Sequence, residues 1–348
     1  MSAEDLSVLP KVLLHDHLDG GLRPQTVLDL AEAGGYGGLP SHDIEELTDW
    51  FFQGRSASLE RYLAAFVHTV GVMQTADAIE RVAFEAVEDL AGQGVVYAEL
   101  RMAPSICTEG DLDLSGAIAA MLAGLRRGET ASGMPARLIV DAMRQESDSL
   151  EVAQAAVEFA GEGVVGFDLA GPEAGFPAGA HREACELALA GGLHLTIHAG
   201  EGDGIESIAG AIEVGAERLG HGVRLVEDME VVAGEAEALG PVARSVFEAG
   251  ITLEICATSN LHTGLFPDAA SHPLGVLHRF GFGVTLNTDN RLMSQITATD
   301  EFSLAVEHHG FDAQELESVT MRAIDSAFCG QATKDLVAEK ITAGYLAD

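Results

Sequence analysis

The sequence predicts an α/β protein folded as a (β/α)₈ TIM barrel, on three observations. Eight short β-type runs are distributed along 348 residues, a length that suits one barrel of this kind. Segments with the apolar spacing of amphipathic helices lie between most of these runs. Several of the helical segments end at glycine before the next run, as at Gly94, Gly192 and Gly250. Such alternation implies a parallel sheet, and a doubly wound open sheet is the alternative architecture.

The expected strands are short, and most are rich in β-branched and other apolar residues. They cover residues 12–15, 95–100, 137–141, 164–168, 193–198, 218–221, 252–256 and 284–287. The helices expected between them have apolar residues three or four positions apart, which places these residues on one face. Clear examples are residues 76–91, 116–125, 150–160 and 181–189.

One interval departs from this regular spacing. Residues 21–94 are far too many for a single crossover, and residues 62–70 and 76–90 have helical periodicity. We therefore expect an added helical layer over the barrel mouth, and a helical tail from about Asp300. The predicted organisation is one domain over residues 1–348, with the helical insertion at about 21–94.

The composition narrows the classes of partner. Fifty-five acidic residues against 19 basic ones give a net charge of −36, which repels nucleic acid and anionic membranes. No uncharged apolar run reaches the roughly 18 residues of a transmembrane helix. The acidic N-terminus does not resemble a secretory signal. We expect a cytoplasmic protein that binds a small molecule, and its oligomeric state is left open.

The cysteines and lysines limit the kinds of metal site. Four scattered cysteines form neither a disulfide framework nor a Cys-x-x-Cys motif. Only three lysines are present, Lys11, Lys334 and Lys340, which disfavours a two-metal centre bridged by a modified lysine. A carboxylate bridge stays possible, but one metal ion per chain is the prediction.

His15 and His17 are the most informative residues in the chain. They follow the apolar run 12–14, and residues two apart on a strand point to the same side. Two neutral imidazoles at the end of a strand are half of a transition-metal site. An incidental pair of surface or core histidines is the alternative interpretation.

Further metal-binding and acidic groups follow other predicted strands at the barrel end where active sites lie. His198 ends the fifth strand, His221 ends the sixth, and Asp289 follows the eighth. With His15 and His17, these residues supply donors for a mononuclear zinc site with a position open for water. Glu201, just after His198, can have a raised pKa and act as a proton donor. His221 can hold or deprotonate the water.

Each of these residues also has a structural interpretation. His198 alone suits a core histidine, Asp289 a turn or helix cap, and Glu201 a cap for the helix expected at 205–214. Independent structural roles would not place metal-binding groups at the ends of four strands, so their joint occurrence favours the metal site. His262 follows the seventh strand and is the least certain of the other histidines.

At this point the chain resembles the adenosine deaminase family, over nearly its whole length. The resemblance is carried by seven segments in order, which together are highly specific: His15-Asp-His-Leu-Asp-Gly-Gly21, Tyr97-Ala-Glu-Leu-Arg101, Asp168-Leu-Ala-Gly-Pro-Glu173, His198-Ala-Gly-Glu201, Arg218-Leu-Gly-His-Gly222, Glu254-Ile-Cys-Ala-Thr-Ser-Asn260 and Leu286-Asn-Thr-Asp289. It implies a zinc-dependent barrel that hydrolyses the 6-amino group of adenosine or 2′-deoxyadenosine.

The resemblance also implies a role for each site residue. The zinc ligands are those already singled out, namely His15, His17, His198 and Asp289. Hydroxide on the zinc would attack C6, and Glu201 would protonate N1. His221 and Asp289 would orient the water and transfer its proton.

The substrate contacts follow from the same resemblance. Gly171 would offer its amide to N3, and Asp19 would accept a hydrogen bond from a sugar hydroxyl. His17 would lie against the substrate as well as the metal.

Asn290 is the one departure from the family pattern, which has a second aspartate at this position. Its amide can donate to N7 of the purine, so purine binding survives. Adenine or a larger aminopurine nucleoside such as aminodeoxyfutalosine is therefore the alternative substrate. The sequence also leaves open a non-catalytic nucleoside-binding relative and a two-metal amidohydrolase. A nucleotide is less expected, because no basic cluster suits a phosphate.

Overall fold

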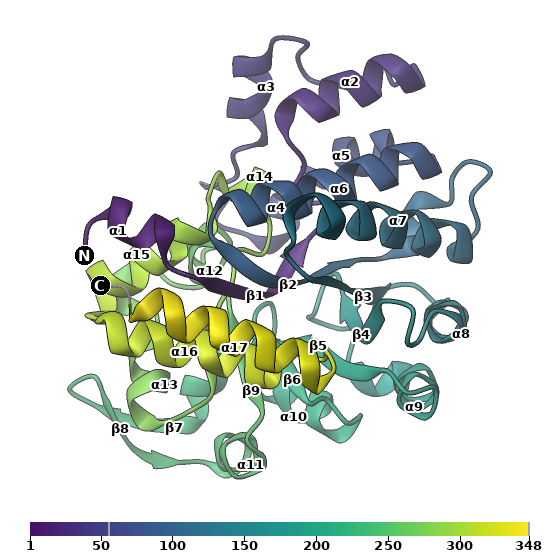
Figure 1. Ribbon diagram of the computed structural model, residues 1–348. Helices are drawn as coiled ribbons and strands as arrows, with labels where there is room; N and C mark the ends of the chain where they lie inside the picture. The colour runs from purple at the N-terminus through teal and green to yellow at the C-terminus, as the bar shows by residue number, and fades with distance from the viewer. Residues whose placement is uncertain (55, 347–348) are drawn as a thin grey trace.

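The computed structural model describes residues 1–54 and 56–346, and its centre is a parallel eight-stranded sheet. The strands are adjacent in the order of the chain (Figure 1), and all eight predicted strands are confirmed. Their bounds are β1 (Lys11–His17), β2 (Val95–Met102), β3 (Ala136–Met143), β4 (Val164–Ala170), β5 (His194–Ala199), β6 (Arg218–His221), β9 (Thr252–Ile255) and β10 (Val284–Leu286).

The first and last strands meet just beyond the end of β10, which makes this a nearly closed barrel rather than an open sheet. The backbone N–H of His17 donates to the carbonyl of Asp289 at 2.8 Å. The N–H of Asp289 donates in turn to the carbonyl of His15 at 3.0 Å. The predicted barrel is confirmed, and its seam joins three predicted site residues.

Helices surround the sheet, as the alternating pattern predicts. The helices of the outer ring and the C-terminal tail are α6 (Ala76–Gly92), α7 (Leu114–Ser132), α8 (Ser149–Glu158), α9 (Arg182–Ala190), α10 (Ile205–Glu213), α11 (Pro241–Ala249), α13 (Leu274–Phe280), α15 (Ala298–His309), α16 (Ala313–Ser326) and α17 (Gln331–Tyr345). The shorter helices are α1 (Ala3–Val8), α2 (Pro24–Gly34), α3 (Ile44–Phe51), α4 (Leu59–Leu63), α5 (Phe66–Val72), α12 (Ala257–His262) and α14 (Arg291–Ser294). The described residues also form 3₁₀ helices at Pro104–Cys107, Ala178–His181, Val223–Asp228 and Ala269–Ser271.

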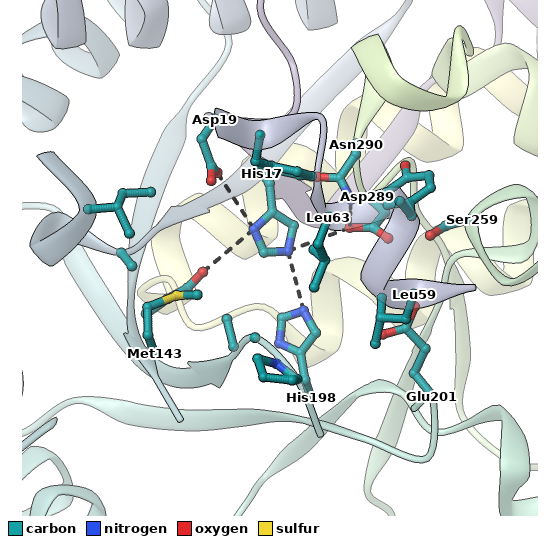
Figure 2. Close-up of a pocket in the computed structure, with 18 of the residues that line it drawn as sticks. His17, Asp19, Leu59, Leu63, Met143, His198, Glu201, Ser259, Asp289 and Asn290 are labelled. Carbon is teal, nitrogen blue, oxygen red and sulfur yellow. Dashed lines mark hydrogen bonds and ion pairs between the residues drawn. The ribbon is translucent and has the colours of Figure 1, made fainter. Parts of the chain in front are cut away.

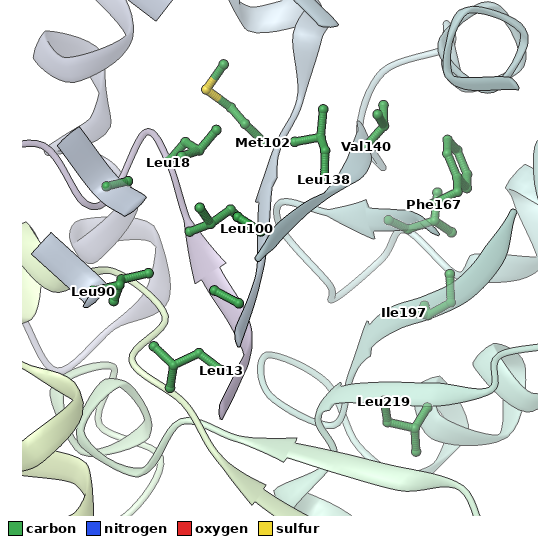
Figure 3. Packing of buried hydrophobic residues seen from close by; sticks show 14 of the residues in the cluster. Leu13, Leu18, Leu90, Leu100, Met102, Leu138, Val140, Phe167, Ile197 and Leu219 are labelled. Carbon is green, nitrogen blue, oxygen red and sulfur yellow. The ribbon is translucent and has the colours of Figure 1, made fainter. Parts of the chain in front are cut away.

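Between the strands and the helices lies a continuous hydrophobic layer, which we call the outer layer. Its strand residues include Leu100, Leu138, Phe167, Ile197 and Leu219, all fully buried (Figure 3). They occupy alternate strand positions, so they share the face turned toward the helices. Burying this apolar area is the main stabilising contribution to the fold.

The strand residues between those of the outer layer face the barrel interior, and many are charged. Glu99, Arg101, Asp168, Arg218 and Glu254 are all buried, with at most 1% of each exposed. Because alternate positions face the helices and the barrel interior, apolar and charged residues alternate in strands such as Tyr97-Ala-Glu-Leu-Arg101. Barrel interiors are more commonly filled by branched apolar side chains.

The structure departs from the predicted elements in two places. An antiparallel hairpin, β7 (Met229–Val232) and β8 (Glu235–Leu239), was not predicted, because its tight turn places Ala233 at a positive φ that alanine seldom adopts. The helix expected over 62–70 is two helices, α4 and α5, because the helical hydrogen-bonding pattern is interrupted at Ala64 and Ala65. No helix in the described part of the chain is long and apolar enough to cross a membrane.

Candidate metal centre and active site

A cavity of about 270 Å³ opens at the carboxyl ends of the barrel strands. Its floor carries the predicted polar residues, and α4 and α5 cover it with apolar side chains, among them Leu59 and Leu63 (Figure 2). Apolar walls with a few polar groups are typical of small-molecule sites. Eight of the nine predicted site residues line it, all except His15: His17, Asp19, Gly171, His198, Glu201, His221, Asp289 and Asn290.

Three histidines converge at the floor of this cavity. His15 and His17 come from β1 and His198 from β5, and their donor atoms lie within 4.8 Å of one another. Nε2 of His17 lies 3.3 Å from Nε2 of His198. Oδ1 of Asp289 lies 3.7 Å from Nε2 of His15 and 3.5 Å from Nε2 of His17. Side chains from segments that are far apart in the sequence thus converge on one point.

These spacings fit a tetrahedral metal ion. With metal–ligand bonds of about 2.1 Å, neighbouring ligands of a tetrahedral zinc are about 3.4 Å apart. Nε2 of His15 is buried without a hydrogen-bond partner, which is costly unless the atom binds something. Burial lowers the pKa values of His15 and His17 well below the ordinary value, so both are in the neutral, metal-binding form.

Buried carboxylates orient two of these histidines from behind. Nδ1 of His15 lies 2.9 Å from Oε2 of Glu254, and Nδ1 of His198 lies 2.8 Å from Oδ2 of Asp168. Such carboxylates fix the proton on Nδ1 and leave Nε2 as the ligand atom. Arg101 contacts both carboxylates, at 2.5 Å for Asp168 and 2.7 Å for Glu254.

Asp289 reaches the cluster through an unusual backbone. Its φ of +58° lies in the left-handed region, which costs free energy for a residue other than glycine. The amide of Asn290 donates to its Oδ1 at 2.7 Å. Cys256 lies close by, but burial raises the pKa of its thiol well above the ordinary value, so the thiol is protonated.

His221 also adopts a positive φ, of +61°, at the end of β6. Regular alternation after Gly220, which faces the interior, would turn His221 outward. The left-handed backbone accompanies a side chain that lines the cavity, with Nε2 3.6 Å from Oε2 of Glu201. A Cβ at position 220 would lie 3.1 Å from Cε1 of His15, so glycine there keeps the floor open.

Glu201 stands on a loop whose shape is set by another carboxylate. Glu173 accepts hydrogen bonds from the backbone N–H groups of Gly200, Glu201 and Gly202, at 2.6, 2.9 and 2.6 Å. Burial raises the pKa of the Glu201 carboxyl well above its ordinary value, and the charges of Asp289 and Glu173 raise it further. A protonated carboxylic acid in this position can donate a proton.

The residues predicted to contact substrate lie around the same cavity. Asp19 is buried, and burial raises its pKa to about 7. Gly171 follows β4 with a φ of +91°, and a Cβ there would lie 2.5 Å from Oε1 of Gln145. Oδ1 of Asn290 is buried without a partner. His262 does not line this cavity.

A family profile described as adenosine deaminase matches residues 10–344. The chain belongs to the adenosine deaminase family. It is 48% identical to an adenosine deaminase of Mycobacterium sp. (strain JLS), over 94% of this chain and 92% of that protein. An adenine deaminase from Arthrobacter aurescens is 26% identical, with a TM-score of 0.86 over 98% of this chain and 100% of that one. The N6-methyl-AMP deaminase from Arabidopsis thaliana is 25% identical, with a TM-score of 0.84 over 100% of each chain.

Adenosine deaminase family enzymes are metal-dependent hydrolases, and the histidine cluster of this member is a possible metal-binding group. Sequence reasoning did not assign the carboxylates behind the histidines or the Glu173 loop contact. Asp168 and Glu254 stand in the segments that carry the family resemblance, but their partners are distant in sequence. The apolar cover of α4 and α5 was assigned only as a helical layer. Strand alternation, which turns Asp168 and Glu254 inward, is the signal that could have revealed them.

Proposed function

We propose that this protein hydrolyses adenosine and 2′-deoxyadenosine to inosine and 2′-deoxyinosine, consuming water and releasing ammonia. The single observation that carries the proposal is Glu201 beside the histidine cluster in a largely apolar cavity. The 48% identity to an adenosine deaminase over 94% of the chain supports adenosine as the substrate.

One zinc ion per chain is proposed as the cofactor, held by His15, His17, His198 and Asp289. Three features support zinc over a cation that prefers oxygen ligands. The histidines are neutral, carboxylates orient two of them, and the ligand atoms lie about as far apart as the ligands of a tetrahedral zinc. Zinc would supply Lewis-acid activation of a water molecule.

The residues around this ion would carry out the proton transfers and orient the reactants. Glu201, kept protonated by burial, would donate its proton to N1 of the purine. The proton on N1 draws electron density from the ring and makes C6 electrophilic toward water. His221 and Asp289 would hold the attacking water in line with C6, since both line the cavity floor.

Four residues are proposed to hold the purine nucleoside. The backbone N–H of Gly171 would donate to N3, and Asp19 would accept from a sugar hydroxyl. Asn290 uses one hydrogen of its amide for Asp289 and would offer the other to N7. His17 would pack against the substrate beside the metal.

The lining of the cavity argues against a nucleotide. Among the described residues, no lysine or arginine lines it, whereas Asp19, Asp141, Glu201 and Asp289 do. A phosphate would lie among carboxyl groups without a basic partner. Adenine is the nearest alternative, because one structural neighbour of the chain is named an adenine deaminase.

Glu201→Gln tests the mechanism, since it removes the acidic proton while keeping the shape of the side chain. We expect kcat to fall by about 10²–10⁴-fold with zinc content unchanged, measured by metal analysis and by the absorbance change of adenosine. The control is Glu206→Gln, an exposed glutamate of α10. Equal activity of Glu201→Gln and wild-type protein would contradict the proposed proton donor.

A panel of 6-aminopurines assayed for ammonia release tests the substrate. Adenosine and 2′-deoxyadenosine should react with higher kcat/KM than adenine, AMP or aminodeoxyfutalosine. Zinc-loaded protein that leaves both nucleosides unchanged would contradict the proposed substrate but not the family.

A further inference from the structure

A chain of buried hydrogen bonds runs from a helix backbone to His221, which lies beside the proposed metal ligands His15 and Asp289. The backbone N–H of Leu274, the first residue of α13, donates to Nδ1 of His272 at 3.1 Å. Nε2 of His272 lies 3.2 Å from Oδ1 of Asn260 in α12. Nδ2 of Asn260 lies 3.0 Å from Nδ1 of His221. All three side chains are buried, with at most 2% exposed.

The backbone amide sets the direction of every bond in this chain. Because Nδ1 of His272 accepts from Leu274, a neutral His272 carries its hydrogen on Nε2. Burial lowers the pKa of His272 to about 3, so the neutral form prevails at pH 7. Its Nε2–H therefore donates to Oδ1 of Asn260. If the Asn260 amide were reversed, its Nδ2–H₂ group would face the Nε2–H of His272, and two donors would be in contact without an acceptor.

The same direction carries through to the cavity. With Oδ1 of Asn260 accepting, its Nδ2–H₂ group must donate to Nδ1 of His221. Nδ1 of a neutral His221 is then an acceptor, and its hydrogen lies on Nε2. That atom is the one that faces the cavity and Glu201, at 3.6 Å from Oε2.

We infer that Asn260 and His272 are positioning residues that hold His221 as the Nε2–H tautomer, a hydrogen-bond donor toward the reacting oxygen. The role of that donor rests on the proposed function, whereas the tautomer itself does not. In this form Nε2 has no lone pair to remove a proton from water, so His221 orients the water instead of deprotonating it. The backbone N–H of Leu274 is the origin of this preference, because a backbone amide can only donate.

Nuclear magnetic resonance of the zinc-loaded protein tests the tautomer directly. With ¹⁵N-labelled histidine, long-range ¹H–¹⁵N correlations distinguish the two neutral tautomers from the cation, and His221→Asn and His272→Leu assign the signals by their loss. We expect Nε2–H patterns for His221 and His272. A hydrogen on Nδ1 of His221, in either the neutral or the cationic form, would overturn the inference, whatever substrate the protein turns over.

Asn260→Asp tests the link between the tautomer and turnover. A carboxylate only accepts, so it would draw the hydrogen of His221 to Nδ1 and turn Nε2 into an acceptor. We expect the His221 signals to change form and kcat for adenosine to fall by about 10²-fold, with KM within about threefold. His278→Gln is the matched control, a half-buried histidine of α13 outside the chain of bonds. Unchanged His221 signals in Asn260→Asp would contradict the assignment.

A pair of substitutions at His272 separates positioning from packing. His272→Gln keeps an N–H donor for Asn260, whereas His272→Leu keeps only the bulk. The His272→Gln variant should retain most of the wild-type kcat and the Nε2–H pattern of His221, and the His272→Leu variant should lose both. Equal kcat and equal His221 signals in the two variants would overturn the role given to His272. Absence of adenosine turnover in the wild-type protein would instead count against the proposed function.

Discussion

The outer layer and the barrel interior are both buried, yet opposite kinds of residue fill them. The outer layer is apolar, with Leu100, Leu138 and Phe167 packed toward the helices (Figure 3). The interior holds ionised groups in direct contact, such as Arg218 with Glu99 at 2.6 Å and with Glu254 at 2.7 Å. Alternate positions of the same strands thus belong to two different environments.

Because of this difference, substitutions in the two regions should have different effects on stability and on metal binding. A strand residue of the outer layer, such as Leu138, contributes through its buried area and faces the helices instead of the barrel interior, so its loss should affect only folding. An interior charge is different, because Arg101 contacts Asp168 and Glu254, which orient His198 and His15. Changes in the interior should therefore affect folding and the metal together.

Arg101→Met should have the largest effect, because it removes one cation from between two buried carboxylates. We expect a loss of about 3–5 kcal/mol in the free energy of unfolding, the usual result of leaving buried charges unpaired. Zinc affinity should fall by about 10–100-fold as the orienting carboxylates shift. Denaturant unfolding of the metal-free protein and zinc titration measure the two effects.

Leu138→Ala is the matched change in the outer layer. It should cost about 2–5 kcal/mol of stability through the cavity it leaves, with zinc affinity and kcat unchanged in the folded protein. A loss of zinc affinity in Leu138→Ala as large as that in Arg101→Met would remove the distinction between the two regions.

Lys11, at the start of β1, is a buried charge whose hydrogen bonds are to carbonyls and not to a carboxylate. Its Nζ donates to the carbonyls of Ser7, Leu9 and Gln93. Burial lowers the pKa of Lys11 to about 8, below its ordinary value of 10.5. Between these two values the folded state has lost a proton that the unfolded state keeps, so this group adds stability as pH rises from 8 to 10.5.

Lys11→Met removes that pH dependence. Relative to wild type, the variant should lose up to about 3 kcal/mol of stability between pH 8 and 10.5, and the difference should be constant below pH 7. Denaturant unfolding at several pH values with fixed zinc measures it. A stability difference independent of pH would show that Lys11 keeps its ordinary pKa in the folded protein.

Thr196→Val should have the smallest effect. The hydroxyl of Thr196 donates to Oε1 of Glu254 at 2.8 Å, and valine preserves the shape without the hydrogen bond. We expect a loss of about 1 kcal/mol, with zinc affinity within about threefold, because Arg101 and Arg218 still hold Glu254. Unfolding midpoints and zinc titration provide the comparison.

Much of the fold could be predicted because its signals are local. The eight strands and most helices follow from apolar spacing and glycine positions, which act over a few residues. The β7–β8 hairpin was missed because an alanine stands where turn residues usually do. A shift in register between Leu13 and Asp16 of β1 was also invisible, since it depends on pairing with β2.

The candidate site divides in the same way. His15, His17, His198, Glu201 and Asp289 could be singled out because each residue type has a known chemistry at a strand end. The pairing of each histidine with the carboxylate behind it could not be predicted, because His15 and Glu254 are 239 positions apart in the chain. Nothing in a single sequence indicates which buried charges become partners.

The sequence by itself determined the alternation of strands and helices, the polar residues at the strand ends and the family they resemble. Periodicity and residue chemistry are properties of short segments, so they can be recognised without knowing the fold. Only the tertiary structure decided which carboxylate orients which histidine, and that a backbone amide of α13 directs the hydrogen bonds leading to His221. Barrel closure brings those groups together across long stretches of chain, and hydrogen-bond direction depends on every partner at once.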